Sequence, residues 1–254
     1  MKYYIVTGSS RGLGHALVRE LAGEGRTVVA ISRSGTDVEG LARRGGEVVD
    51  LQRDLSNTDA VDGVMDDVFA RIDVSAAEGL YLINNAGLVD PVAPVERQAL
   101  DDVVLHMSVN LIAPMRLMAR FIALTEQAQC RKVVANVSSS AGGSPYRGWG
   151  PYCAAKAGLN MFGRVAGLEQ RQRPDAAGSP VIVYAVAPGK VDTGMQARLR
   201  DLTEADFPDH AAFVQYKERG ELSSPEHAAR LVAATLDSPK IASGDVIDVR
   251  DFEF

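Results

Sequence analysis

The sequence predicts an α/β fold in which helices cover both faces of one doubly wound parallel β-sheet of about seven strands. Short runs of β-branched and apolar residues alternate with helix-length amphipathic stretches along the whole chain, which is typical of strands joined by helices. The strand runs are almost continuously apolar, as expected when both faces of a sheet are covered. No Pro/Gly/Ser-rich linker interrupts this pattern, so we expect a single domain over residues 1–254.

The first part of the chain contains four expected strands and two expected helices. The strands are runs rich in Val, Ile, Leu and Tyr, and the helices carry apolar residues every three or four positions. The apolar stripe of the first helix consists of Leu13, Leu17 and Leu21. The expected order is strand 3–7, helix 11–23, strand 27–32, strand 46–51, helix 57–72 and strand 80–84.

The second part continues the alternation and contains one exception. The expected order is helix 95–107, helix 109–128, strand 132–138, helix 151–169, strand 181–186, helix 225–236 and strand 245–249. The exception is a charged segment over about residues 190–220, which contains Pro208. This segment is expected to be an insertion near the substrate, either a mobile lid or a solvated helical segment.

Composition excludes several classes of function. A net charge of -6 argues against binding to nucleic acid or to an anionic membrane surface. No apolar run approaches the ~20 residues of a membrane span, and the N-terminus lacks the apolar core of a secretion signal, so we expect a cytoplasmic protein. The 2 cysteines cannot build a disulfide framework, and the 4 histidines do not have metal-ligand spacing, so no metal site is expected.

Glycines gather between the first expected strand and the first helix, where residues 7–14 read TGSSRGLG. Gly8, Gly12 and Gly14 allow backbone N–H groups to approach a phosphate, and the N-terminus of the helix adds a positive dipole. The alternative is a plain glycine-rich turn. The strand–turn–helix context favours a loop that binds the pyrophosphate of a dinucleotide.

The end of the second expected strand indicates which dinucleotide is bound. An acidic residue there would accept hydrogen bonds from the adenosine ribose of NAD, but after this strand begins the first acidic residue is Asp37, beyond the strand end. Arg33 can instead pair with a 2′-phosphate, to which Ser32 or Ser34 can donate a hydrogen bond, and Arg11 of the glycine loop can reach the same phosphate. The sequence therefore predicts NADP(H) as the cofactor.

Polar residues at later strand ends form a pattern suited to carbonyl chemistry. Tyr152 and Lys156 are four residues apart on an expected helix, so they share a face. Ser139 follows the strand 132–138, and Asn110 lies in the helical region after the sequence NNAG at residues 84–87. Each of these features alone occurs often by chance. All of them together, in this order and at these strand ends, are not explained by chance.

These motifs resemble the short-chain dehydrogenase/reductase family, and the resemblance covers nearly the whole chain. It implies a Rossmann-type sheet and a catalytic tetrad in which Tyr152 is the general acid. Lys156, with the oxidised nicotinamide, would lower the pKa of Tyr152 from its ordinary value of about 10 and would hold the nicotinamide ribose. Ser139 would orient the carbonyl oxygen, and Asn110 would position a water in a proton relay.

The glycine loop, the strand end and the resemblance together imply a set of residues around the cofactor. They are Gly8, Ser10, Arg11, Gly12, Leu13, Gly14, Ser32, Arg33, Asp54, Leu55, Asn85, Ala86, Gly87, Tyr152, Lys156, Pro188, Gly189, Val191, Thr193 and Met195.

Three segments, at residues 146–156, 187–196 and 243–249, resemble the sepiapterin reductases and the bacterial benzil (diketone) reductases of this family. The resemblance implies that Asp248 anchors the amino group of a pterin and that Trp149 forms an aromatic wall, with Ser139 and Tyr152 completing the substrate site. Asp248 can alternatively be a strand-end carboxylate with a structural partner. Gly194 departs from the sepiapterin reductases, which commonly have an acidic residue there.

The sequence therefore predicts NADPH-dependent reduction of a small-molecule ketone or α-dicarbonyl to the alcohol. The alternatives are an NAD(P)-dependent alcohol dehydrogenase for another substrate class and a non-catalytic NADP-binding sensor. The family resemblance further implies a homodimer or homotetramer that associates through the helices expected over 109–128 and 151–169.

Overall fold

The computed structural model describes residues 1–38, 40–41, 45–173 and 178–252, and it contains a 7-stranded sheet in which every strand pairing is parallel. The strand order is β3-β2-β1-β4-β5-β6-β7, so the direction of winding reverses between β1 and β4. This arrangement confirms the predicted Rossmann-type fold. The strands are β1 (Lys2–Thr7), β2 (Arg26–Ser32), β3 (Glu47–Gln52), β4 (Gly79–Asn84), β5 (Arg131–Val137), β6 (Val181–Ala187) and β7 (Val246–Asp248).

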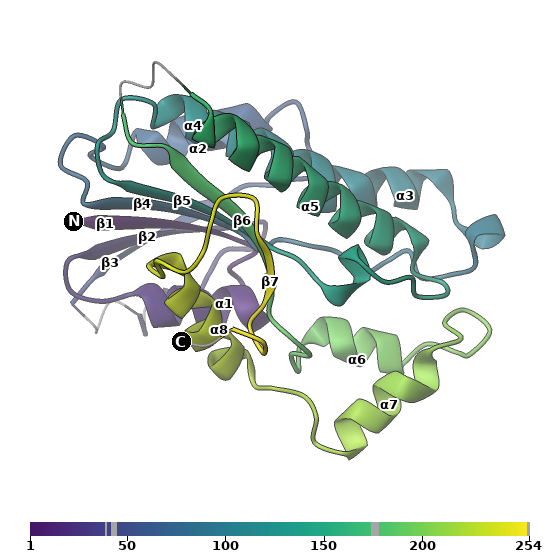
Figure 1. Ribbon diagram of the computed structural model, residues 1–254. Coiled ribbons are helices and arrows are strands. Elements are labelled where there is room, and N and C mark those ends of the chain that lie inside the picture. The colour runs from purple at the N-terminus through teal and green to yellow at the C-terminus, as the bar shows by residue number, and fades with distance from the viewer. Residues whose placement is uncertain (39, 42–44, 174–177, 253–254) are drawn as a thin grey trace.

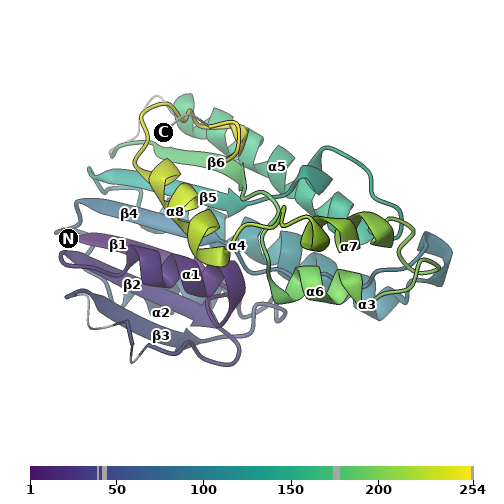
Figure 2. The ribbon, with the colours of Figure 1, turned by 90° about the horizontal axis from the view of Figure 1, so that it is seen from below.

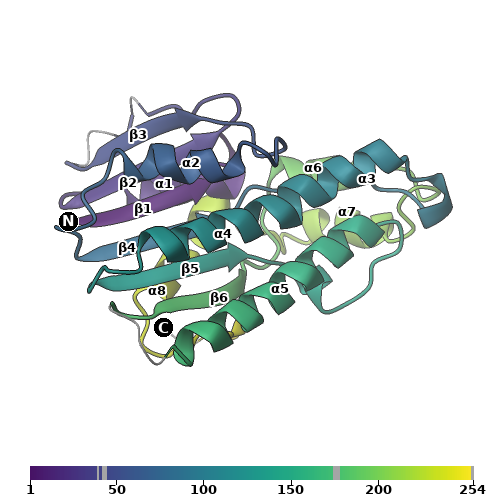
Figure 3. The same cartoon turned by 90° about the horizontal axis from the view of Figure 1, so that it is seen from above.

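Helices lie on both faces of the sheet. Figure 2 shows α1 and α8 on one face, and Figure 3 shows α2, α4 and α5 on the other. Successive strand residues supply the two cores alternately, because side chains of a strand point to opposite faces: Tyr4 and Val6 pack with the first pair of helices, and Tyr3 and Ile5 with the others. The helices are α1 (Gly12–Leu21), α2 (Val61–Phe69), α3 (Leu100–Met107), α4 (Ala113–Leu124), α5 (Gly150–Arg171), α6 (Gly194–Arg200), α7 (His210–Glu218) and α8 (Pro225–Leu236).

The predicted break between two helices near residue 108 is wrong. A π-helical turn, Ser108–Ile112, joins α3 to α4 without interruption. Pro114 explains the local geometry, because it has no N–H to donate to the carbonyl of Asn110 four residues earlier. The beginning of the predicted helix 95–107 is a separate 3₁₀ turn, Val95–Arg97.

The joined helix bears on the expectation that no apolar run approaches the ~20 residues of a membrane span. Leu100–Leu124 is a 25-residue helix that is long and apolar enough to cross a membrane by length and composition alone. In this fold the apolar residues of α4 serve to pack the helix against the sheet. Leu117, Met118 and Phe121 of α4 are fully buried against the sheet and α2.

The segment over residues 190–220, predicted to be a lid or a helical insertion, contains α6 and α7. Leu199, Phe207 and Phe213 of this segment are buried in an apolar cluster that also contains Trp149 and Tyr152. The helical part of the prediction is therefore confirmed, and mobility stays a prediction. Figure 1 shows both helices beyond the carboxyl ends of the strands, away from α1 and α8.

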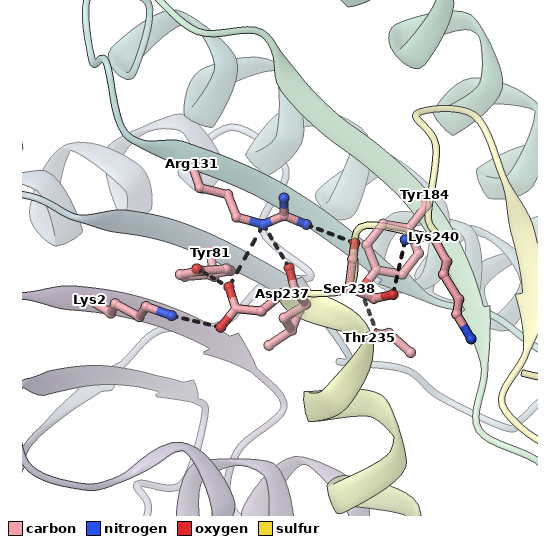
Figure 4. Close-up of polar contacts among 9 residues, drawn as sticks. Lys2, Tyr81, Arg131, Tyr184, Thr235, Asp237, Ser238 and Lys240 are labelled. Carbon is pink, nitrogen blue, oxygen red and sulfur yellow. Dashed lines mark hydrogen bonds and ion pairs between the residues drawn. The ribbon is translucent and has the colours of Figure 1, made fainter. Parts of the chain in front are cut away.

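A polar network fixes the end of α8 at the opposite edge of the sheet (Figure 4). The carboxylate of Asp237, the residue after α8, accepts hydrogen bonds from Lys2 Nζ at 2.7 Å and from the Tyr81 hydroxyl at 2.5 Å. Arg131 Nε lies 3.7 Å from the same carboxylate. Because these partners come from β1, β4 and β5, the network attaches the end of α8 to the centre of the sheet.

Candidate active site

The carboxyl ends of the parallel strands border a cleft of about 1490 Å³. In open α/β sheets this edge is where ligands bind, and the reversal between β1 and β4 marks its centre. Every residue predicted to contact the cofactor or the substrate lines the cleft. Asn110 does not line the cleft. Its side chain is buried and contacts the backbone of Leu88, which does line the cleft.

The glycine loop between β1 and α1 has no room for a side chain at Gly8 or Gly14. A Cβ on Gly14 would lie 2.1 Å from the carbonyl oxygen of Gly8, and a Cβ on Gly8 would lie 2.7 Å from the Cα of Ala86. Gly8 and Gly12 also have positive φ angles of 70° and 56°, which favour glycine. The loop therefore exposes backbone N–H groups to the cleft at the start of α1.

This cradle fits the phosphates of a dinucleotide. The N-cap residue of α1, Arg11, makes no side-chain hydrogen bond to the helix, and the first turn contains no acidic residue. The N–H groups of the first turn and the positive end of the helix dipole are thus directed toward the cleft without a competing carboxylate.

Thr7, which the sequence analysis did not single out, connects the glycine loop to the NNAG segment. Its Oγ1 accepts hydrogen bonds from the backbone N–H groups of Asn85 and Ala86, both at 3.0 Å. The Asn85 side chain returns a hydrogen bond to the Thr7 carbonyl at 2.9 Å. The position of Thr7 at the start of the glycine motif was the available signal.

The end of β2 carries a polar pair with unused hydrogen-bonding capacity. Ser32 Oγ is buried and has no hydrogen-bond partner among the residues that the structure describes. Arg33 is exposed at the rim of the cleft, and within those same parts of the chain it forms no ion pair. An anionic group placed here would satisfy both side chains.

Ser139, Tyr152 and Lys156 lie together at the end of β5 and the start of α5. Lys156 Nζ donates a hydrogen bond to the Val137 carbonyl at 2.8 Å and lies 5.5 Å from the centroid of the Tyr152 ring. Ser139 Oγ accepts a hydrogen bond from Ala141 N–H at 3.1 Å, which holds it at the start of a 3₁₀ turn packed on α5. Tyr152 and Lys156 are 6% and 5% exposed, so both side chains are withdrawn from bulk water.

Burial controls the ionisation of this group. Burial raises the pKa of Tyr152 to about 12, and a hydrogen bond with Ser139 opposes this rise. Burial also lowers the pKa of Lys156 to about 8. The lowering of the Tyr152 pKa that the sequence analysis expects involves an oxidised nicotinamide and stays a prediction.

The side chain of Asn110 fastens the chain just after the NNAG segment. Its Oδ1 accepts a hydrogen bond from Leu88 N–H at 2.7 Å, and its Nδ2 donates to the Leu88 carbonyl at 2.8 Å. A second Nδ2 contact, at 2.8 Å, reaches His106 Nε2. Asn110 lies in the π-helical turn, and its side chain holds the backbone of the loop at Leu88.

Aromatic side chains form part of the wall of the cleft. Trp149 stacks on Tyr152 with ring centroids 4.3 Å apart and an angle of 11°, and its Nε1 donates to the Val89 carbonyl at 3.3 Å. Phe213 and Tyr146 meet the Trp149 ring edge-on and also line the cleft. Of these rings only Trp149 was predicted from the sequence, because the others converge from α7 and from a loop.

Asp248 lines the cleft, but its carboxylate already has a partner. Arg250 Nε donates to Asp248 Oδ1 at 2.8 Å and Arg250 Nη2 to Oδ2 at 2.6 Å, a bidentate pair. Arg250 holds the pKa of Asp248 below its ordinary value. Arg250 also borders Gly189, whose added Cβ would lie 3.3 Å from Arg250 Cδ. The alternative of a strand-end carboxylate with a structural partner is thus present in the structure.

Ion pairs connect the α6–α7 segment to the rest of the cleft. Arg198 of α6 pairs with Asp90, which lies in the loop after β4, at 3.1 Å. Arg147 pairs with Asp209 at 2.8 Å, beside the start of α7. Asp90 and Arg198 both line the cleft, and neither was singled out from the sequence. In the described part of the chain no cluster of three or more His, Cys, Asp or Glu side chains could hold a metal ion.

Comparison with known proteins agrees with this geometry. Residues 2–204 match the family model of the short chain dehydrogenases. The chain is 36% identical over 251 residues to a benzil reductase ((S)-benzoin forming) of Bacillus cereus, covering 98% of this chain and 99% of the relative. It is 30% identical to a sepiapterin reductase of Xenopus laevis, with 97% and 95% covered.

Solved structures show the same fold. The enzyme KRED1-Pglu superposes with a TM-score of 0.81 at 26% identity, covering 97% of this chain and 100% of that one. A short-chain dehydrogenase/reductase of Saccharomyces cerevisiae superposes with a TM-score of 0.83 at 24% identity, covering 99% of this chain and 97% of that one. The protein belongs to the short-chain dehydrogenase/reductase family. It is an oxidoreductase that acts on C=O or CH–OH groups with a nicotinamide cofactor.

Proposed function

We propose that this protein is an NADPH-dependent carbonyl reductase that converts a ketone or an α-dicarbonyl, of the benzil or sepiapterin type, into the alcohol. One observation carries the proposal. Tyr152, Lys156 and Ser139 border the same cleft as the glycine cradle and as an aromatic wall that includes Trp149. A proton donor, a cofactor cradle and an apolar substrate wall thus meet at one edge of the sheet.

The preference for NADPH rests on the end of β2. The 2′-phosphate would receive the Arg33 guanidinium and the orphaned Ser32 hydroxyl, with Arg11 of the glycine loop within the same rim. Each charge-assisted hydrogen bond of this kind contributes roughly 1.5–3 kcal/mol. One such contact favours NADPH over NADH by about 10-fold or more.

When bound, the cofactor supplies a hydride to the carbonyl carbon. Ser139 donates a hydrogen bond to the carbonyl oxygen and orients it. Tyr152 gives its phenolic proton to that oxygen as negative charge develops there. A pKa of about 12 keeps this phenol protonated at neutral pH, which is the state that reduction needs. Lys156 lies beside the ring and stabilises the phenolate that forms.

The proposed relay through Asn110 uses its backbone. The side-chain amide is engaged by Leu88 and His106, so the backbone carbonyl, which Pro114 cannot bond, is the group that we assign to a relay water. This assignment revises the role of the residue and keeps it in the tetrad.

The substrate half of the cleft favours an aryl ketone or diketone. Trp149, Tyr146 and Phe213 provide flat apolar surfaces, which suit aromatic rings. A pterin would need Asp248 as a hydrogen-bond acceptor, and Arg250 occupies that carboxylate. We therefore place benzil-like diketones before sepiapterin among the candidates.

We further propose that the protein is cytoplasmic and assembles as a homodimer or homotetramer. Met161, Val165 and Leu168 are exposed on α5, at 57%, 46% and 46%, and Ile112 is 40% exposed just before α4. These apolar side chains match the helices expected to associate. Sedimentation velocity would show a single monomeric species if this proposal were wrong.

The function is tested by following NADPH oxidation by fluorescence over a panel of benzil, other diketones, quinones, simple ketones and sepiapterin. We expect turnover with benzil and a weaker reaction with sepiapterin. Binding of NADPH without turnover of any carbonyl would favour the non-catalytic sensor. Faster oxidation of an alcohol with NAD would favour the dehydrogenase alternative.

A further inference from the structure

His106 is a buried titratable side chain of the active site that the proposed mechanism does not use. It occupies the last turn of α3 and is 0% exposed. Its ring meets the Tyr152 ring edge-on, with centroids 6.0 Å apart and an angle of 74°. Both of its ring nitrogens have partners: Nδ1 lies 2.7 Å from the Asp90 carbonyl oxygen and Nε2 lies 2.8 Å from Asn110 Nδ2.

These contacts determine which nitrogen of the ring carries the proton. Leu88 sets the orientation of the Asn110 amide, because its N–H must meet Oδ1 and its carbonyl must meet Nδ2. The second N–H of Asn110 then points at His106 Nε2, which must accept. The remaining proton lies on Nδ1 and is donated to the Asp90 carbonyl.

We propose that His106 is the positioning residue of this active site: its neutral imidazole holds the Asn110 amide and the loop of residues 88–90 in place, and its protonation releases both. The proposal rests on the carbonyl reductase function in that the loop and Asn110 flank the catalytic groups. A protonated ring would direct an Nε2–H at the Asn110 N–H, placing two donors face to face without an acceptor.

The clamp joins three parts of the site. Through Asn110 it holds Leu88, the residue after the NNAG segment that borders the cofactor cleft. Through Nδ1 it holds Asp90, whose carboxylate pairs with Arg198 of α6. Through its ring it supports Tyr152. Protonation of one side chain would thus loosen the loop between the cofactor and the α6–α7 segment.

Burial, more than the surrounding charges, favours the neutral ring of His106. The titratable and charged groups on the adjoining elements are Lys156 and Tyr152 of α5, Asp90 with its partner Arg198, and Asp102 one turn earlier on α3. Burial lowers the pKa of His106, and the Lys156 charge lowers it further against the opposing effects of Asp90. The release is therefore expected below the ordinary histidine pKa of about 6.5.

A first test needs no substrate. Long-range ¹H–¹⁵N spectra of protein labelled at the histidine rings report which ring nitrogen is protonated, and the signals of His106 are assigned by their loss in His106→Gln. We expect the Nδ1–H form at pH 7.5, with Nε2 unprotonated. An Nε2–H form, or a cation at this pH, would overturn the proposal.

A second test measures kcat for benzil from pH 5 to 8 in three variants. His106→Gln offers a side-chain oxygen in place of Nε2 and cannot be protonated, so we expect kcat at pH 7.5 within about threefold of the native protein and no acid limb. His106→Phe leaves the buried Asn110 N–H without an acceptor, and kcat is expected to fall by about 10-fold. His227→Gln, on the exposed start of α8, is the matched control and should keep the native profile.

The outcomes separate the clamp from the proposed function. Equal impairment of the Gln and Phe variants, or an acid limb that persists in His106→Gln, would overturn the role of His106. If the native protein reduces no carbonyl while its spectra show the Nδ1–H form, the proposed function fails and the clamp stands.

Discussion

The indole of Trp149 lies parallel to the phenol ring of Tyr152, with the centroids 4.3 Å apart and the planes at 11°. The edge of His106 and the ammonium of Lys156 complete the surroundings of that ring. These contacts hold the ring and leave the hydroxyl to interact with Ser139. Packing and proton transfer are therefore carried by different atoms of the same side chain.

Tyr152→Phe separates these two roles. The ring contacts remain, so NADPH binding and thermal stability should change little, while turnover should fall by about 10²–10⁴-fold because the general acid is lost. Fluorescence titration with NADPH and initial rates with benzil provide the measurements. Tyr146→Phe is the matched control, since Tyr146 also lines the cleft and its hydroxyl contacts Ser140 at 3.2 Å. Near-native turnover in Tyr152→Phe would remove Tyr152 from the acid role.

Arg33→Ala tests the preference for NADPH. Loss of the guanidinium should raise the KM for NADPH by about 10-fold or more and leave the KM for NADH nearly unchanged, because only NADPH carries the 2′-phosphate. Steady-state kinetics with both cofactors give the comparison. Equal changes for the two cofactors would show that Arg33 does not contact the 2′-phosphate.

Lys156 is expected to lower the free energy of unfolding at neutral pH, although catalysis requires its charge. Its folded-state pKa of about 8 lies below its ordinary value, so the unfolded chain binds a proton that the folded chain releases above pH 8. The penalty is fully present below pH 8 and disappears as the pH rises toward the ordinary value of about 10.4. Lys156→Met should abolish turnover and raise the free energy of unfolding at pH 7 by about 2 kcal/mol, after about 1 kcal/mol is lost with the bond to Val137.

Chemical unfolding of both proteins at pH 7, 8 and 10 measures this effect. The stability difference should shrink between pH 8 and 10, because the buried lysine of the folded protein then releases its proton and no longer carries a desolvated charge. A variant that is less stable than the native protein at pH 7 would contradict the expected penalty.

Substrate choice between a pterin and a diketone depends on the Asp248–Arg250 pair. Asp248→Ala should weaken the binding of pterin-like substrates and spare simple diketones. Arg250→Ala should free the carboxylate of Asp248 and lower the KM for sepiapterin by about 10-fold, the value of one charge-assisted hydrogen bond. Asp248→Asn in the same background should reverse the gain. Parallel changes for benzil and sepiapterin would show that the pair is structural only.

Local patterns were sufficient for most of the fold. The strand runs and the helical stripes predicted the order of the main elements, because hydrophobic periodicity depends only on neighbours in sequence. The glycine loop and the Tyr152/Lys156 spacing were readable for the same reason. The joined helix at Ser108–Ile112 was missed because its turn is stabilised partly by Asn110 reaching a distant loop.

The contacts that tune the site include one between near neighbours in sequence and several between residues far apart. Arg250 meets Asp248 only two residues away, and that short spacing was the signal overlooked. His106 meets Asp90, and Arg198 meets Asp90 from a different element, and no periodicity links these positions. The aromatic wall similarly gathers Phe213 from α7 beside Trp149.

Local sequence patterns indicate the strands, the glycine cradle and the tyrosine, lysine and serine that meet at the carboxyl edge, because each is encoded by residues close together in the chain. The packing of separate elements was needed to show that the Asn110 side chain holds Leu88, that Asp90 is held by His106 and Arg198, and that burial raises the pKa of Tyr152 to about 12. Burial and long-range pairing arise only when separate elements pack together, and they set the charge states on which the chemistry depends.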